Sequence, residues 1–290
     1  MLDSLQSQTC PPDQVVIVDT GPHPDQGLIQ EFPRLNMSYT HLPGGSISSA
    51  RNQGANLISP ATSLIGFGED DAVWEPNAVQ AMLNFWDKTP RDLGGAGFNF
   101  HNSLPTQTAR QWRLPGMTAF YRAFLGGRPS PGRVRRTGYP TPIYPAKETI
   151  YVDWLEGISV WRVEVLRQFR FDEFFAGYGY SEQLDFSYRV GKVWRLAVVA
   201  EANVAHYPGP VKNNYLFGRK QIINRVHFVR KHQELSFPRC LAALVVHTAF
   251  NAAAGLILQD TSYFRRAWGN CAGFAQLAAG RLEPVEGAVK

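Results

Sequence analysis

The first hundred residues alternate between segments typical of β-strands and segments typical of α-helices. Apolar runs over 14–20, 62–68 and 92–100 have the length and composition of buried strands. Between them, 46–59 and 75–88 carry apolar residues at helical spacing. Strands separated by helices pair mainly in parallel, and the helices cover both faces of the sheet. The chain is therefore predicted to be an α/β protein with a mainly parallel sheet.

Length and composition fit a folded protein with an anionic partner. The 290 residues suit one large domain or a domain with an appendage, and a hydrophobic fraction of 44% supplies a core. The formal net charge of +5 favours contact with a phosphorylated metabolite, a nucleic acid or an anionic membrane. The three cysteines are scattered and lack the spacing of a zinc site or a disulfide framework, which favours a reducing compartment, the cytoplasm.

The second half of the chain is irregular at first and helical at its end. Residues 101–150 are rich in Arg, Pro, Gly and Tyr and are interpreted as a long loop or small insertion, either a binding loop or a solvated spacer. After this segment we expect a short helix beginning near Ser181 and a strand over 194–200. The sequence thus predicts one domain over 1–210 and a helical C-terminal region over 211–290.

An uncharged run, 240–258, stands out in the C-terminal region. Its length alone would permit a membrane span. Polar or small residues nevertheless fall along one stripe of this predicted helix, which favours burial against the protein or a position in the membrane interface. Arg265 and Arg266 follow, and they either meet anionic lipid headgroups or form a solvated helix end. The residues of the stripe are His247, Thr248, Asn251, Gly255 and Gln259.

Three acidic residues, Glu69, Asp70 and Asp71, follow the predicted strand 62–68. Ligands of α/β proteins bind beyond the carboxyl ends of the strands. Alternate residues point to the same side, so Glu69 and Asp71 are expected to converge. Carboxylates there suit Mg²⁺ or Mn²⁺ with a diphosphate. The alternative is a polar turn that caps the helix beginning near Pro76.

Four blocks of the sequence matter together because of their order along the chain. They are "LDSLQSQTCPPDQVVIVDTG", "SISSARNQGANL", "GFGEDDAVWEPNAV" and "WLEGISVWRVEVLRQFRFDEFFAGYGYSEQLDFSYRV". Together they resemble the family 2 glycosyltransferases over roughly residues 3–210. The resemblance implies an inverting, nucleotide-sugar-dependent enzyme. It also implies the GT-A fold, in which a mixed, mainly parallel sheet is flanked by helices, here with a C-terminal helical extension.

The resemblance also implies roles for individual residues. Asp19, at the end of the strand 14–20, and the "ARNQG" block, through Arg51 and Asn52, would contact the nucleotide. Asp70 would reach the nucleotide's ribose or only the turn. The acidic triplet would hold the diphosphate and a divalent cation, Mg²⁺ or Mn²⁺. The residues assigned to the cation are Glu69, Asp71 and His206, and those assigned to the acceptor are Trp154, Leu155 and Gly157.

The segment "SEQLD" departs from the family pattern. The family has an aspartate, commonly the catalytic base, where this chain has Gln183, and an amide cannot accept a proton at neutral pH. Glu182 or Asp185 would then take the role, and we favour Glu182. The alternative is that both acids complement the helix dipole, with Asp185 paired to Arg189 four residues later. Glu69 is a second departure, since the family normally has aspartate there.

The chain also begins where the family's second element begins. The first residues match the helix that follows the family's first, central strand. Losing a central strand leaves buried backbone groups unpaired, at about 1–3 kcal/mol per group. We expect an incomplete N-terminus, with a misassigned start or another element in the gap as alternatives.

The sequence thus predicts transfer of a sugar from a nucleotide-diphosphate donor to a glycan or polyprenyl-linked acceptor. The basic and apolar C-terminal region favours work in the cytoplasm at the inner face of the membrane, as in surface polysaccharide assembly. A nucleic-acid partner is not expected, because basic residues are dispersed apart from 132–136. One alternative is a catalytically inactive nucleotide- or glycan-binding protein. The other is a nucleotidyltransferase, but such an enzyme normally needs a glycine-rich phosphate loop, and none is visible in the sequence.

Overall fold

A computed structural model describes residues 1–25, 27–103 and 130–287 of the chain. The chain divides into two compact units. We call the first the sheet unit; it comprises Met1–Leu104, Pro142–Asp172 and Gln183–Pro208. We call the second the helical unit; it comprises Pro105–Thr141, Glu173–Glu182 and Gly209–Lys290. The division into 1–210 and 211–290 stays a prediction, and residues 104–129 of the predicted loop lie outside the described residues.

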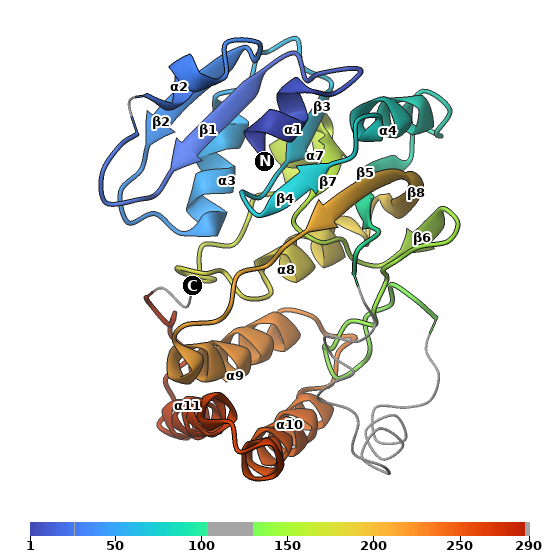
Figure 1. The fold of residues 1–290 in the computed structure, drawn as a ribbon. Coiled ribbons are helices and arrows are strands. Elements are labelled where there is room, and N and C mark those ends of the chain that lie inside the picture. The colour runs from blue at the N-terminus through green and yellow to red at the C-terminus, as the bar shows by residue number, and fades with distance from the viewer. Residues whose placement is uncertain (26, 104–129, 288–290) are drawn as a thin grey trace. The chain divides into compact units, whose positions relative to one another are not determined.

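The sheet unit contains the described strands and six of the helices (Figure 1). Its strands are β1 (Val15–Asp19), β2 (Met37–His41), β3 (Leu64–Phe67), β4 (Ala72–Trp74), β5 (Leu93–Phe100), β6 (Ile150–Val152), β7 (Ser159–Arg162) and β8 (Arg195–His206). Its helices are α1 (Leu2–Gln6), α2 (Leu28–Glu31), α3 (Ile47–Asn56), α4 (Ala78–Trp86), α7 (Val163–Gln168) and α8 (Glu182–Val190), of which the first residue of α8 is counted with the helical unit.

Most of the predicted elements are confirmed, with shifts at their ends. Helix α4 begins two residues after Pro76, so this proline lies before the helix rather than in its first turn. Strand β8 is longer than the predicted 194–200 and includes His206 as its last residue. Ser46 starts α3 as expected, because its side chain accepts a hydrogen bond from the Ser49 amide at 3.0 Å.

The main sheet is mixed. Its strand order is β3-β7-β5-β8-β4, with β6 also paired to β8. Among the described strands, only β5–β8 and β1–β2 pair in parallel. Strand β7 runs antiparallel between β3 and β5, and β4 and β6 run antiparallel to β8. The predicted α/β sheet flanked by helices is present, but parallel pairs are fewer than the strand–helix alternation suggested.

Strands β1 and β2 form a sheet of their own. Among the described strands, β1 pairs only with β2, and β3 pairs only with β7. Helix α1 connects the two sheets by packing, because Met1 and Leu5 contact the core beneath β1 as well as the main core. Gln8 then fixes the end of this segment to α4, with hydrogen bonds to the Glu75 carbonyl at 2.8 Å and from the Val79 amide at 3.0 Å.

Strand β5 is buried along its whole length, and glycines let large side chains cross it. A Cβ atom on Gly95 would lie 2.5 Å from the ring of Trp161, which is 2% exposed. A Cβ on Gly97 would lie 3.0 Å from Leu155. The glycine-rich composition of "LGGAG" is thus required by the packing of β7 and of the segment before it against β5.

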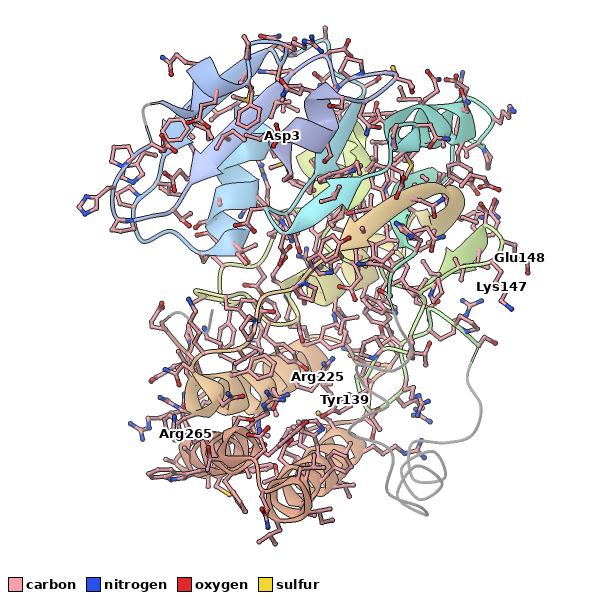
Figure 2. All side chains as sticks on the ribbon, viewed as in Figure 1. Asp3, Tyr139, Lys147, Glu148, Arg225 and Arg265 are labelled. Carbon is pink, nitrogen blue, oxygen red and sulfur yellow. The ribbon has the colours of Figure 1, made fainter. Side chains whose placement is uncertain are left out.

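The helical unit is built on α9 (Asn214–Arg230), α10 (Phe237–Leu258) and α11 (Thr261–Ala278). Glycines allow α9 and α11 to touch: a Cβ on Gly269 would lie 1.9 Å from the Tyr215 carbonyl oxygen. Figure 2 labels Arg225 and Tyr139, and the buried guanidinium of Arg225 lies over the Tyr139 ring at 4.6 Å. The guanidinium also donates a hydrogen bond to the Gly138 carbonyl at 2.6 Å. Neutral groups, the ring and this carbonyl, therefore largely stabilise its buried charge.

Gly95→Ala should destabilise the sheet unit by about 1–3 kcal/mol, because the new methyl group overpacks the core against Trp161. Gly66→Ala is the matched control, since its Cβ would meet only Val160 at 3.8 Å. Chemical denaturation of both variants measures the difference. Equal stability of the two variants would show that β5 does not need this glycine.

Candidate metal and nucleotide site

The acidic triplet and His206 meet because two antiparallel strands bring them to the same edge. Strand β3 ends at Phe67, and Glu69 and Asp71 follow before β4 begins. In the β4–β8 ladder Ala72 faces His206, and the Tyr207 amide donates to the Asp71 carbonyl at 2.8 Å. This register sets His206 beside Asp71, although the two lie far apart in the sequence.

Three potential ligand atoms, one each from Glu69, Asp71 and His206, lie within 4.8 Å of one another. The Nε2 atom of His206 is 3.1 Å from Asp71 Oδ1 and 3.5 Å from Glu69 Oε2. The three side chains are 18–25% exposed, so solvent and a small ligand can reach them. The structure therefore brings together all three residues that the sequence assigned to the cation.

Arg51 holds Glu69 from the other side. Its Nη2 atom is 2.8 Å from Glu69 Oε1, and its side chain is only 8% exposed. The guanidinium also lies 5.7 Å and 5.4 Å from the ring centres of Phe67 and Phe171, which shield it from water. A pair this well shielded fixes the orientation of the Glu69 carboxylate.

Gly157 leaves the space that this ion pair occupies. A Cβ atom at position 157 would lie 1.9 Å from Glu69 Oε1 and 2.6 Å from Arg51 Nη2. The glycine of the "WLEG" segment is therefore needed for close approach of its backbone to the acidic edge.

Glu156 is a site residue that the sequence analysis missed. Burial and, second, the charge of Glu69 raise the pKa of its carboxyl to about 7, against the opposing effects of His206 and Arg51. It precedes Gly157, so the signal was present as an acid within "WLEG". The resemblance assigned roles only to Trp154, Leu155 and Gly157 of that segment, and none to Glu156.

Opposing charges set the protonation of the other groups. Burial alone would raise the pKa of Glu69, but the hydrogen bond with His206 and the charge of Arg51 lower it to about 2. Burial alone would lower the pKa of His206, but Glu69, Asp71 and Glu156 outweigh it and raise this pKa above its usual value. Arg51 and the proton that the raised pKa of His206 favours thus both oppose the negative charge of the carboxylates.

The donor set fits a divalent cation. Two carboxylates and one imidazole suit Mn²⁺, and Mg²⁺ is compatible through the carboxylates. A cation requires neutral imidazole, so it competes with the proton that the raised pKa of His206 favours. Cation affinity is therefore expected to weaken as the pH falls.

Asp19 lies at the end of β1 and has its own partners. It accepts hydrogen bonds from the Tyr39 hydroxyl at 2.5 Å and from the Gly21 amide at 2.8 Å. The Tyr39 bond is the main cause that lowers the pKa of Asp19, with Gly21 second. His41, in the next strand, contacts the Gly21 carbonyl at 2.8 Å. Asp19 is thus a fixed carboxylate at a strand end, and nucleotide binding stays a prediction for it.

Asn52 has a clear structural use. Its amide donates to the Phe171 carbonyl at 3.0 Å and accepts from the Phe171 amide at 2.9 Å. This two-bond clamp holds Phe171 beneath Arg51. The predicted nucleotide contact of Asn52, and that of the exposed Asp70, stay predictions.

The three predicted acceptor residues differ in exposure. Leu155 is completely buried, Trp154 is 7% exposed, and Gly157 approaches Glu69 as described above. The Leu155 amide donates to the Ser187 hydroxyl at 3.0 Å, which ties this segment to α8. Leu155 thus supports the site from the core in this structure, and acceptor contact stays a prediction for the segment.

The two candidate bases lie in α8. Asp185 is fully buried and pairs with Arg189 at 2.9 Å, as the i,i+4 spacing predicted. Glu182 is 1% exposed and starts the helix. It follows Ser181, whose φ of 74° is left-handed and costs energy for a residue other than glycine. Such strain is most often found at functional positions.

Gly157→Ala should change the geometry of the site while leaving the stability of the fold nearly unchanged. The methyl group would push aside the ends of two flexible side chains, so stability should change by less than about 1 kcal/mol. Displacing the Arg51–Glu69 pair should weaken Mn²⁺ binding at least about tenfold, measured by calorimetry. Unchanged Mn²⁺ affinity would contradict the role of this close approach.

Glu156→Gln should alter the pH dependence of stability. The folded protein binds a proton at Glu156 with a pKa of about 7, above the usual 4.5, so it holds more protons than the unfolded chain between these values. The free energy of unfolding therefore falls as pH rises through this window. In EDTA the variant should gain about 1–2 kcal/mol on wild type between about pH 5 and pH 8.

Glu164→Gln, which changes an exposed acid of α7 in the same unit, serves as the control and should leave the profile unchanged. If the free energy of unfolding changed with pH in the same way for wild type and Glu156→Gln, the burial of this carboxyl would be contradicted.

Comparison with known proteins gives a family and a fold. The family model described as glycosyl transferase family 2 matches residues 1–151. The comparison with curated protein sequences found no match. The solved structure of S. aureus TarS 1-349 is 15% identical and has a TM-score of 0.50, with 97% of this chain and 87% of that chain covered.

Two further structures are similar. GalNAc-T7 with UDP, GalNAc and Mn²⁺ is 12% identical, with a TM-score of 0.50 over 71% of this chain and 39% of that chain. A longer S. aureus TarS structure is 16% identical, with a TM-score of 0.49, and this chain spans 39% of it. At these identities the likeness supports the fold, which is GT-A. Because the family model covers more than half of its residues, the chain belongs to glycosyl transferase family 2.

Proposed function

We propose that this chain transfers a sugar from a nucleoside-diphosphate donor to a glycan or lipid-linked acceptor, with inversion and with the help of a divalent cation. The observation that carries the proposal is the cluster of Glu69, Asp71 and His206 at the strand ends, held by Arg51. The UDP and Mn²⁺ present in the GalNAc-T7 structure agree with this chemistry on the same fold.

The site residues have complementary tasks in this reaction. A bound cation would act as a Lewis acid that stabilises the departing diphosphate. Asp71 and Glu69 would supply its oxygen ligands, and His206 a nitrogen ligand. Arg51 would keep Glu69 oriented and add positive charge near the diphosphate. Asp19, Asn52 and Asp70 are proposed to contact the nucleoside.

Glu182 is the proposed base that takes the proton of the acceptor hydroxyl. It starts α8 directly after the strained Ser181, whereas Asp185 is already paired with Arg189. An inverting displacement needs such a base on the face of the sugar opposite to the leaving group. Trp154, Leu155 and Gly157 are proposed to lie near the acceptor.

A catalytically inactive binding protein on the same fold is the second candidate. Gln183 replaces the acid that commonly serves as base in the family. In addition, Arg51 and a protonated His206 can neutralise Glu69 and Asp71 without a metal. Such a protein would bind a nucleotide without turning over a sugar donor.

The proposed setting is the cytoplasm, at the inner face of the membrane, in the assembly of a surface polysaccharide. The support is the apolar and basic character of α10 and of the start of α11. Helix α10 is the one helix of the described residues that is long and apolar enough to cross a membrane.

Asp71→Asn should reduce Mn²⁺-stimulated hydrolysis of UDP-sugars by roughly 100-fold, because it removes a charged ligand while keeping the shape of the side chain. Glu75→Gln, an exposed acid at the start of the next segment, should retain wild-type turnover. The assay measures UDP release over a panel of donors with and without EDTA.

Glu182→Gln distinguishes the two candidates. An active enzyme should lose turnover by about 100-fold or more while keeping its affinity for UDP. If wild type binds UDP but releases none from any donor, and Glu182→Gln binds equally well, the inactive binding protein is the better description.

A further inference from the structure

Helix α10 presents an unusual surface for a helix at the outside of a folded unit. Its most apolar 18-residue stretch has a mean hydropathy of 1.9, yet only 33% of that stretch is buried. Pro238 and Arg239 are exposed at its start, but every exposed position of α10 from Ala242 onward is apolar. Of these, Ala242, Val245, Ala249 and Leu256 follow helical spacing, and Ile257 and Leu258 complete the end of the helix. A surface helix normally carries polar residues on such a face, so this one lacks its expected solvent-facing side.

The apolar surface widens where α10 meets α11. Leu256, Ile257 and Leu258 are 71%, 55% and 46% exposed at the end of α10. Phe264 and Trp268, one turn apart on α11, are 40% and 70% exposed. We call these five residues, together with the exposed Ala242, Val245 and Ala249 of α10, the apolar face. Its end with Trp268 combines large aliphatic and aromatic side chains, as membrane-interface segments do.

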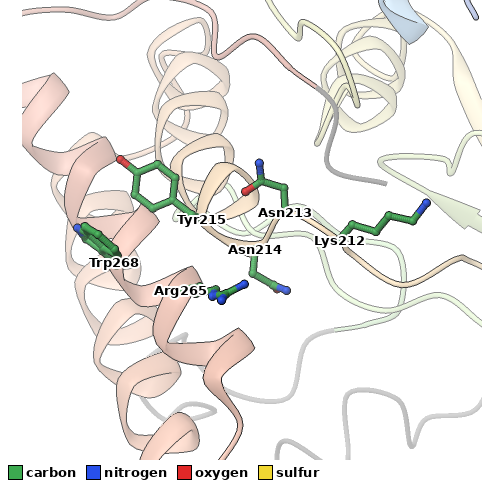
Figure 3. Close-up of a pocket in the computed structure, with 6 residues that line it drawn as sticks. All are labelled: Lys212, Asn213, Asn214, Tyr215, Arg265 and Trp268. Carbon is green, nitrogen blue, oxygen red and sulfur yellow. The ribbon is translucent and has the colours of Figure 1, made fainter.

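Positive charge borders the apolar face. Figure 3 shows Trp268 and Arg265 of α11 beside Lys212 and Tyr215, around an open cavity of about 430 Å³. Arg265 and Lys212 are both exposed. Between Glu234 and Glu283 the exposed charged residues are three arginines, at 239, 265 and 281, and one acid, Asp260, which leaves a surface charge of 3 − 1 = +2. Anionic lipid headgroups complement such a surface.

The two consecutive arginines have different roles. Arg266 turns inward: it donates to Asn214 Oδ1 at 2.6 Å and lies over the Phe217 ring at 5.0 Å. Arg265 is exposed and lines the cavity, as Figure 3 shows. Neither of the two alternatives for this pair, headgroup contact or a solvated helix end, holds for Arg266, and only Arg265 is exposed.

The opposite side of α10 belongs to the protein. Asn251 is 2% exposed and donates to Asn270 of α11 at 3.0 Å, and Asn270 in turn donates to the Gly218 carbonyl of α9 at 2.9 Å. Gly255 lets Phe264 pack against the helix. A helix tied to its neighbours by buried amides cannot be surrounded by lipid, so α10 would lie along the surface rather than span it.

We propose that the apolar face docks on a bilayer that contains anionic lipids, with Trp268, Phe264 and Ile257 in the interface and Arg265 and Lys212 at the headgroups. The docking follows from exposure and charge alone. Only its purpose, bringing the site to a lipid-linked acceptor, rests on the proposed function.

Flotation of the full chain with phosphatidylcholine vesicles, with and without phosphatidylglycerol, tests this proposal. Wild type should float with phosphatidylglycerol vesicles, and added salt should weaken the binding. The double variant Ile257→Ser/Trp268→Ser should lower the bound-to-free ratio at least about tenfold, and Arg265→Glu by about threefold to tenfold. Val193→Ser, which alters a valine of the sheet unit that is 68% exposed, is the matched control and should bind as wild type does.

Two readouts keep the outcomes distinct. Light scattering without lipid measures whether the chain self-associates: a wild-type dimer that Ile257→Ser/Trp268→Ser makes monomeric, with no vesicle binding, would overturn the proposal in favour of a face between two copies. Failure of wild type to float with either vesicle would also overturn it. Hydrolysis of soluble UDP-sugars is measured in parallel, so a chain that floats but has no turnover contradicts the proposed function and leaves docking intact.

Discussion

The concentration of acidic groups at one edge of the sheet is the constraint around which the site is organised. Glu69 and Asp71 lie together beside His206, and the charge of Glu69 acts on the carboxyl of Glu156. Such a group of acids is unfavourable unless cations balance it. Arg51 and His206 supply that balance, and Gly157 supplies the space in which Arg51 reaches Glu69. In the proposed function a divalent cation would replace the proton on His206, and the same carboxylates would become its ligands.

Much of the site could be predicted because its residues stand at or just beyond strand ends, and because the acidic triplet lies within one of the four sequence blocks. Glu69, Asp71 and His206 were assigned together from the sequence, and the β4–β8 register explains why they meet. Glu156 was missed because its importance comes from burial beside Glu69, which no local pattern reports. Likewise, the antiparallel insertion of β7 depends on long-range pairing, which strand–helix alternation does not encode.

In the helical unit, too, features that depend on contacts between distant segments could not be predicted from the sequence. The sequence identified an apolar helix with a stripe of polar or small residues, and the structure buries Asn251 and Gly255 of that stripe. It could not predict that Arg266 turns inward while the adjacent Arg265 remains exposed. That difference depends on Asn214 and Phe217, which come from another helix. Neighbouring residues of identical type thus acquire a structural role and a surface role.

The central claim is that Glu69, Asp71 and His206 bind a divalent cation together with the donor's diphosphate. A crystal grown with UDP and Mn²⁺ and measured at a wavelength where manganese scatters anomalously tests it directly. The account predicts one anomalous peak within coordination distance of all three side chains, bridged to the diphosphate oxygens. A diphosphate bound in the site by Arg51 and His206, with no anomalous peak beside Asp71, would contradict it.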